Sequence, residues 1–166
     1  MSASDDPRRL TDPSAVAMDE HALALANGIE AVLGKWVVRC VVELVTAWSG
    51  SVDPEVRAAA EEAGERCRVE VGSEVRTLLL TDIDAQRGTP LAILRRAVSY
   101  PTEVLAGAGV PHVVRDSFAE RMFPDDVYGL APASFSDVDP SLSELGITWG
   151  AAKAFEHKRR HRSPRS

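Results

Sequence analysis

Apolar residues recur at every third or fourth position from Ser14 to Trp48, which is the period of an α-helix. The second half of this stretch is rich in valine and would suit a β-strand by composition alone. However, Lys35, Arg39 and Glu43 are spaced four residues apart, so that on a helix they form one narrow polar stripe. The pattern therefore predicts a long helix, buried on its other sides, that lies at the centre of the fold or in an oligomer interface.

A second helical pattern begins at Pro54 and continues to about Gln86. Its outer face is charged, and Glu62 and Arg66 are placed as a favourable i,i+4 ion pair. Gly64 and Gly72 lower the helix propensity, and a break near Gly72 is possible. Two such helices joined by a short turn predict an antiparallel hairpin whose arms are each roughly 50 Å long at 1.5 Å per residue.

The predicted helix starts share one local signal, a capping residue followed by proline. Aspartate and threonine cap the first turn, and proline suits the first helical position. The signal occurs at Asp12–Pro13, Asp53–Pro54, Thr89–Pro90 and Asp139–Pro140. Shorter helices are expected from Pro90 to about Ser99 and from Thr102 to Ala106, and a last helix, capped by Thr148, from Trp149 to about His161.

Between Val110 and Ser143 the period becomes irregular and prolines recur, although apolar residues remain frequent. Such a stretch is typical of an ordered strap that packs over other elements. The expected fold class is all-α: a long antiparallel helical hairpin, with shorter C-terminal helices and a proline-rich strap packed on it. We expect a flexible arm over residues 1–12, a single helical domain over 13–152 and a basic tail over 153–166 that continues the last helix.

The composition fits one packed domain. The chain has 166 residues, is 45% hydrophobic and carries a net charge of −6. Cys40 and Cys67 both fall in apolar stretches, which is typical of buried thiols in a cytosolic protein and not of a disulfide scaffold. No apolar signal segment opens the sequence, and its most hydrophobic stretch, Trp36 to Trp48, is too short to span a bilayer. We therefore expect a cytoplasmic protein with no membrane association.

Residues 153–166 are strongly basic although the whole chain is acidic. The cations that form a candidate binding surface there are Lys158, Arg159, Arg160 and Arg162. They could neutralise the phosphates of a nucleic acid or of a ribosome, dock onto an acidic protein or onto the acidic body of this chain, or remain solvated. A platform for stacking bases is not indicated, because Phe155 is the one aromatic residue in the segment.

A second candidate surface lies around Arg95 and Arg96, with His112 and Tyr128 of the strap nearby. The two arginines could bind an anionic group, or they could anchor acidic residues of the strap such as Asp125 and Asp126. Together these residues suggest an alternative class, a small helical enzyme or ligand-binding protein with a pocket under the strap.

The patterns that would indicate catalysis or a metal are weak. His157 and His161 share a helix face, but the surrounding cations would repel a metal ion. The segment from Asp137 to Ser143 alternates oxygen-bearing side chains as a calcium loop does, but the strict glycine of that loop is Leu142 here. A nucleophile elbow and a glycine-rich phosphate loop are missing from the sequence. We therefore predict no metal, no cofactor and no catalytic residue.

The segments PTEVL at 101–105, FPDDVY at 123–128 and WGAAKA at 149–154 are distinctive. They resemble those of a family of conserved actinobacterial helical proteins, and the resemblance covers about residues 74–161. It implies an actinobacterial, cytoplasmic origin and a shared surface near these segments. It implies no activity, cofactor or catalytic residue.

The function predicted from the sequence is a non-enzymatic protein-interaction or regulatory module, which binds a protein partner or itself. This prediction rests on the long, apolar helix that contains Trp36 and Trp48, because such a helix needs other surfaces to cover it. The alternative is a factor that binds nucleic acid or a ribosome through its basic C-terminal tail.

Overall fold

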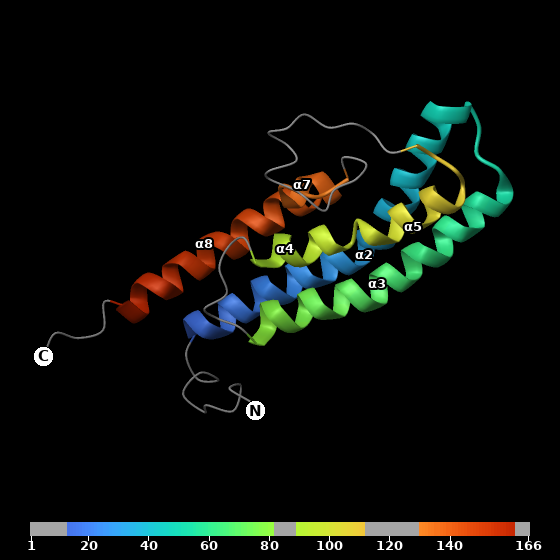
Figure 1. The fold of residues 1–166 in the computed structure, drawn as a ribbon. Helices are drawn as coiled ribbons and strands as arrows, with labels where there is room; N and C mark the ends of the chain where they lie inside the picture. Colours follow the sequence, from blue (N-terminus) through green and yellow to red (C-terminus); the bar gives the residue numbers. More distant parts are fainter. Residues whose placement is uncertain (1–12, 82–88, 112–129, 162–166) are drawn as a thin grey trace, which may run out of the picture.

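Two long helices form the body of the molecule (Figure 1), which is a computed structural model. The described residues are 13–81, 89–111 and 130–161, with side chains described between Asp19 and Arg159. Helix α2 spans Pro13–Ser49 and helix α3 spans Pro54–Thr81. Gly50 begins the turn between them with a φ of 85°, a conformation that glycine adopts without strain. The predicted all-α fold is confirmed, and no strand occurs among the described residues.

The two long helices touch where Gly34 of α2 faces Gly64 of α3. A Cβ added to Gly64 would lie 2.6 Å from the carbonyl oxygen of Gly34, and a Cβ on Gly34 would lie 3.2 Å from the carbonyl oxygen of Gly64. The 2.6 Å distance is a clash with backbone, so Gly64 leaves no room for a side chain, and the 3.2 Å distance at Gly34 is tighter than an ordinary van der Waals contact. The helices therefore meet backbone to backbone at this point.

The core extends from this crossing along both helices. The fully buried side chains include Leu25, Ile29 and Leu33 of α2 and Cys67 and Val75 of α3. Burial of each large aliphatic side chain contributes about 1.5–3 kcal/mol. Trp36 is only 3% exposed, so this tryptophan is covered within the chain and needs no partner. Trp48, at the end of α2, is half exposed.

Two short helices cover one side of the hairpin. Helix α4 spans Thr89–Arg96 and packs on α3, and helix α5 spans Ser99–Gly107 and packs on both α2 and α3. Helix α7 spans Phe135–Val138, and helix α8 spans Leu142–His161. Figure 1 shows α8 running back along α2 towards the end where α2 begins.

Two glycines allow α8 to approach its neighbours. A Cβ on Gly28 of α2 would lie 2.8 Å from Cδ1 of Leu145, so α8 begins against the middle of α2. A Cβ on Gly146 would lie 2.5 Å from the ring of Phe135, which also packs edge-on against Trp149 with a centroid distance of 6.3 Å. These contacts join α7 and α8 to the hairpin.

The start predicted for the last helix is wrong. It begins at Leu142, and Thr148 lies inside it. The carboxylate of Asp139 accepts a hydrogen bond from the backbone N–H of Ser141 at 2.9 Å, so the Asp139–Pro140 signal marks this helix start. The segment predicted as a strap contains helix α7. Residues 112–129 of that segment lie outside the described residues.

The possible break at Gly72 does not occur, because α3 is continuous through it. A Cβ on Gly72 would lie 2.9 Å from Cγ of Glu30, so the glycine makes room for the Glu30 side chain. Glu30 accepts two hydrogen bonds from Arg76, both at 2.8 Å, and Arg76 also donates to the side-chain oxygen of Asn27. The predicted end of α3 near Gln86 lies outside the described residues.

We predict that Gly64→Ala destabilises the protein by about 1–3 kcal/mol, although alanine favours a helix more than glycine does. The new methyl group would press on the Gly34 carbonyl and force the helices apart. Chemical denaturation measures the change. Gly107→Ala is the control, because a Cβ there meets nothing within 4 Å, and it should change stability by less than about 0.5 kcal/mol. Equal effects of the two substitutions would contradict the close crossing.

We predict that the ion pair between Arg76 and Glu30 stabilises the fold only while Glu30 is ionised. The hydrogen bonds from Arg76 hold the pKa of Glu30 below its ordinary value of 4.5. A lowered pKa in the folded state adds stability above pH 4.5, and this stability is lost as the pH falls through the folded-state value. Arg76→Gln should therefore cost about 1 kcal/mol at pH 7 and much less at pH 3, as measured by urea denaturation at both pH values. A cost independent of pH would contradict the assignment.

Candidate functional site

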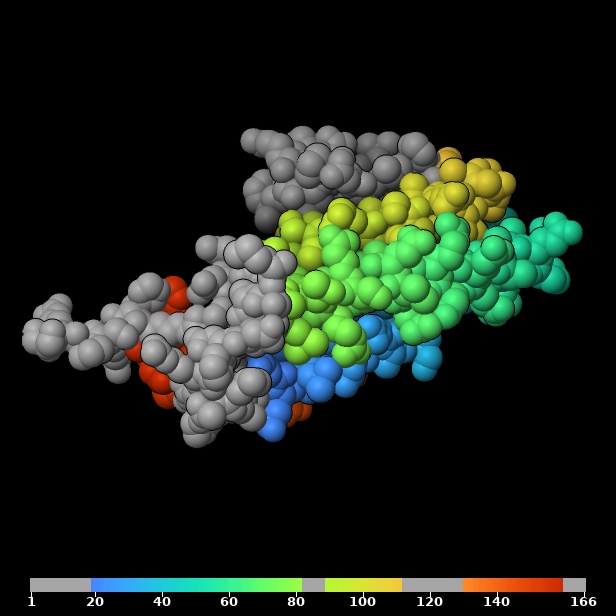
Figure 2. Space-filling model, turned by 90° about the horizontal axis from the view of Figure 1, so that it is seen from below, coloured from blue at the N-terminus to red at the C-terminus, as the bar shows by residue number. Residues whose placement is uncertain are grey.

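Helix α3 separates two open grooves of opposite charge. Figure 2 shows α3 across one face of the molecule, with α5 on one side of it and α2 on the other. The groove between α2 and α3, here called the basic groove, has a volume of about 550 Å³. The groove between α3 and α5, here called the acidic groove, has a volume of about 410 Å³.

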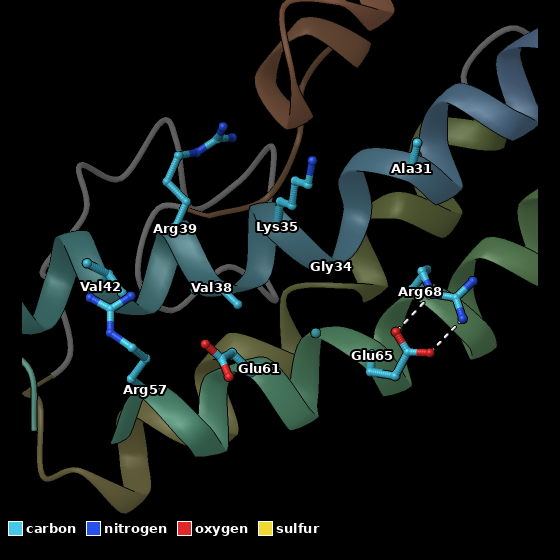
Figure 3. Close-up of a pocket in the computed structure, with 11 residues that line it drawn as sticks. Ala31, Gly34, Lys35, Val38, Arg39, Val42, Arg57, Glu61, Glu65 and Arg68 are labelled. Carbon is cyan, nitrogen blue, oxygen red and sulfur yellow. Dashed lines mark hydrogen bonds and ion pairs between the residues drawn. The ribbon is translucent and has the colours of Figure 1, made fainter. Parts of the chain in front are cut away.

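The floor of the basic groove is formed by small and apolar residues beside the helix crossing, including Gly34, Val38 and Val42. Its charged residues are Lys35 and Arg39 of α2 with Arg57, Glu61, Glu65 and Arg68 of α3. In Figure 3, Lys35 and Arg39 extend from the same side of α2, and Glu61 and Glu65 extend from α3. The cations outnumber the carboxylates, although the whole chain is acidic.

The cations of the basic groove differ in how they are held. Arg68 donates two hydrogen bonds to Glu65, at 2.6 and 2.9 Å, and this pairing lowers the pKa of the Glu65 carboxyl group. Arg39 donates to the carbonyl oxygen of Val138 at 2.6 Å, which ties the end of α7 to α2. Within the described part of the chain, Lys35 and Arg57 form no ion pair. These two cations are therefore available to an anionic group that enters the groove.

The acidic groove has the opposite character. Its floor contains Ala59 and Val104, and its edges carry Glu55, Glu62 and Glu103. The one cation that lines it, Arg66, pairs with Glu103 at 3.5 Å and lies over the ring of Tyr100. Neither Glu55 nor Glu62 forms an ion pair with another described residue. The lining thus carries an excess of negative charge on a partly apolar floor.

Four of the predicted site residues, Arg95, Arg96, Lys158 and Arg159, line neither of these two grooves. Arg95 and Arg96 end α4, and Arg96 pairs with Glu74 of α3, so its carboxylate partner comes from the hairpin. The partners predicted from the sequence for the two arginines, Asp125 and Asp126, lie outside the described residues, as does Tyr128. Arg96 therefore fastens α4 to α3.

Three of the predicted tail cations lie in the last turn of α8. Lys158 is exposed, and Arg159 donates two hydrogen bonds to the buried carboxylate of Glu156. Arg160 belongs to α8, although its side chain is not among those described, and Arg162 lies outside the described residues. The outward face of α8 also carries two exposed apolar side chains, Ile147 and Phe155, which are 60% and 63% exposed.

The two thiols are the strongest nucleophiles the chain carries, and both are buried. Burial raises the pKa of the Cys67 thiol to about 12, so the thiolate is scarce at neutral pH. Cys67 lies in the core between the long helices, away from the groove openings.

Within the described ranges, no group of three or more histidine, cysteine, aspartate or glutamate residues is arranged to hold a metal ion. In the same ranges, no helix has both the length and the apolar content that crossing a membrane requires.

Neither groove was identified from the sequence, although some signals were present. Lys35 and Arg39 were recognised as part of a polar stripe, but the residues of α3 that face them depend on how the helices cross. Gly64 looked only like a residue with low helix propensity. Its position opposite Gly34 depends on how the two helices pack, which the helical period of each segment does not reveal.

Comparisons with protein-family models, curated proteins and solved structures found no match to this chain.

We predict that both cysteines resist alkylation in the folded protein at pH 8. Cys40 and Cys67 are buried, and the raised pKa of Cys67 keeps its thiol protonated. Mass spectrometry after treatment with iodoacetamide should find no labelling in buffer and labelling of both residues in denaturant. Rapid labelling of Cys67 in buffer would contradict this placement.

Proposed function

We propose that this protein is a cytoplasmic, non-enzymatic interaction module that binds an acidic segment of a protein partner in the basic groove. The observation that supports this proposal is the local reversal of charge in the groove. Lys35, Arg39, Arg57 and Arg68 gather there on a chain whose net charge is −6.

The form of the groove favours a segment of protein over a small ligand. The groove is open and runs between two long helices, so that an extended or helical segment could lie along it. Its floor at Gly34, Val38 and Val42 suits small apolar side chains. Lys35 and Arg57 then supply charge for carboxylates of the partner, which favours rapid and specific association.

A second candidate function is supported by the tail, where the exposed Lys158 precedes further arginines in the sequence. That function is the binding of nucleic acid or of a ribosome. The two functions depend on different residues, so matched variants separate them.

We predict that the double variant Lys35→Glu, Arg57→Glu loses the acidic partner. Tagged wild-type protein, this groove variant and the tail variant Lys158→Glu, Arg162→Glu would capture proteins from a lysate of the source organism, with and without nuclease. Mass spectrometry should find one acidic protein that is captured by the wild type and by the tail variant, resists nuclease and is lost with the groove variant. The two variants carry the same change of charge, and each therefore controls for the other.

Capture of ribosomal proteins or nucleic acid that is lost with the tail variant and after nuclease treatment would favour the second function. Identical capture by all three proteins would overturn both proposals.

A further inference from the structure

The outward face of α8 carries a row of exposed apolar residues with helical spacing. Ile147, Ala151 and Phe155 follow one another at intervals of four residues, and all three are exposed. By contrast, the outward face of α3 carries mainly charged side chains. Exposed apolar residues in such a row are typical of a binding surface.

Basic residues continue this apolar row at the end of the helix. Lys158 and Arg159 are exposed and lie three and four residues after Phe155 along the chain. A surface of this kind fits an apolar floor with acidic edges. The acidic groove provides both, with Ala59 and Val104 in its floor and Glu55, Glu62 and Glu103 at its edges.

The acidic groove also has room for an aromatic ring. Gly107 lines it, and a Cβ added at Gly107 would meet no atom within 4 Å. Charge, polarity and free space therefore all match the end of α8.

A chain cannot insert its own Phe155 into its own acidic groove. The α8 helix begins against Gly28 and runs towards the start of α2, which places Phe155 about 20 Å from Leu142 at 1.5 Å per residue. The acidic groove lies in the other direction, beside the beginning of α3 and the end of α5 (Figure 1). Phe155 is fixed within a helix, so only another molecule can supply it.

We propose that the end of α8, with Phe155 and Lys158, docks into the acidic groove of a second copy of this chain. Phe155 packs on the floor formed by Ala59 and Val104, and the basic residues that follow it pair with Glu55 and Glu62. This contact goes beyond the proposed function and uses none of the residues of the basic groove. Its failure leaves that proposal intact, and the reverse also holds.

The first test is the self-association of the full chain, measured by sedimentation velocity over a range of concentrations at low and at high salt. The wild type should associate at low salt and dissociate at about 1 M salt, where charges are screened within about 3 Å. Phe155→Ser should weaken association by about tenfold or more, as expected for an anchoring aromatic residue. Glu43→Lys is the control for a change of surface charge, because Glu43 is exposed and lines neither groove, and it should have no effect.

The second test exchanges charge between the two surfaces. The groove variant Glu55→Lys, Glu62→Lys and the tail variant Lys158→Glu, Arg162→Glu should each be monomeric alone. Mixed together they should associate, because the acidic tail of one variant fits the basic groove of the other. Circular dichroism establishes that both variants are folded.

A wild-type chain that stays monomeric throughout would overturn this proposal. Self-association unchanged by Phe155→Ser, or a mixture of the charge variants that stays monomeric, would also overturn it.

Discussion

The contact between Gly34 and Gly64 is the constraint on which the rest of this structure depends. With no side chain at either position, the backbones of α2 and α3 meet, and an added Cβ on Gly64 would lie 2.6 Å from the Gly34 carbonyl oxygen. The close approach fixes which residues of the two helices face each other. On one side it brings Leu33 and Cys67 into the core. On the other side it leaves a shallow groove, with its floor at the glycines and its charged residues on the flanks.

The same crossing determines how charge is divided on the surface of α3. Successive residues of a helix point about 100° apart, so neighbouring glutamates in the sequence are directed to different flanks. Glu61 faces the groove shared with α2, whereas Glu62 faces the groove shared with α5. The charges that α3 contributes to the basic groove cancel, so α2 sets its sign with Lys35 and Arg39. The acidic groove is negative on both sides, since α3 contributes Glu55 and Glu62 against Arg66 and α5 contributes Glu103. The sign of each groove is thus a property of a helix pair.

The dependence of both grooves on helix packing explains which features could be predicted from the sequence. The helical period located α2 and α3, and the Asp–Pro signals marked helix starts, because both are encoded locally. The start of α8 was misplaced because Gly146 weakens the local helical pattern, whereas in the fold it accommodates the ring of Phe135. The grooves could not be found in this way, since they arise from helix contacts. Among the predicted site residues, Arg96 proved to hold two helices together.

The arrangement of the helices also separates the two surfaces of the proposed self-contact, which are the end of α8 and the acidic groove. Helix α2 has 37 residues and extends about 55 Å, and α8 lies along the half of α2 opposite to α5. An elongated body of this kind keeps the end of α8 away from the acidic groove of its own chain. A compact bundle would let the apolar and basic end of α8 fold back onto the acidic groove and cover it. Elongation therefore leaves two complementary surfaces, the end of α8 and the acidic groove, exposed on one molecule. The basic groove stays open between α2 and α3 whether or not those two surfaces are joined.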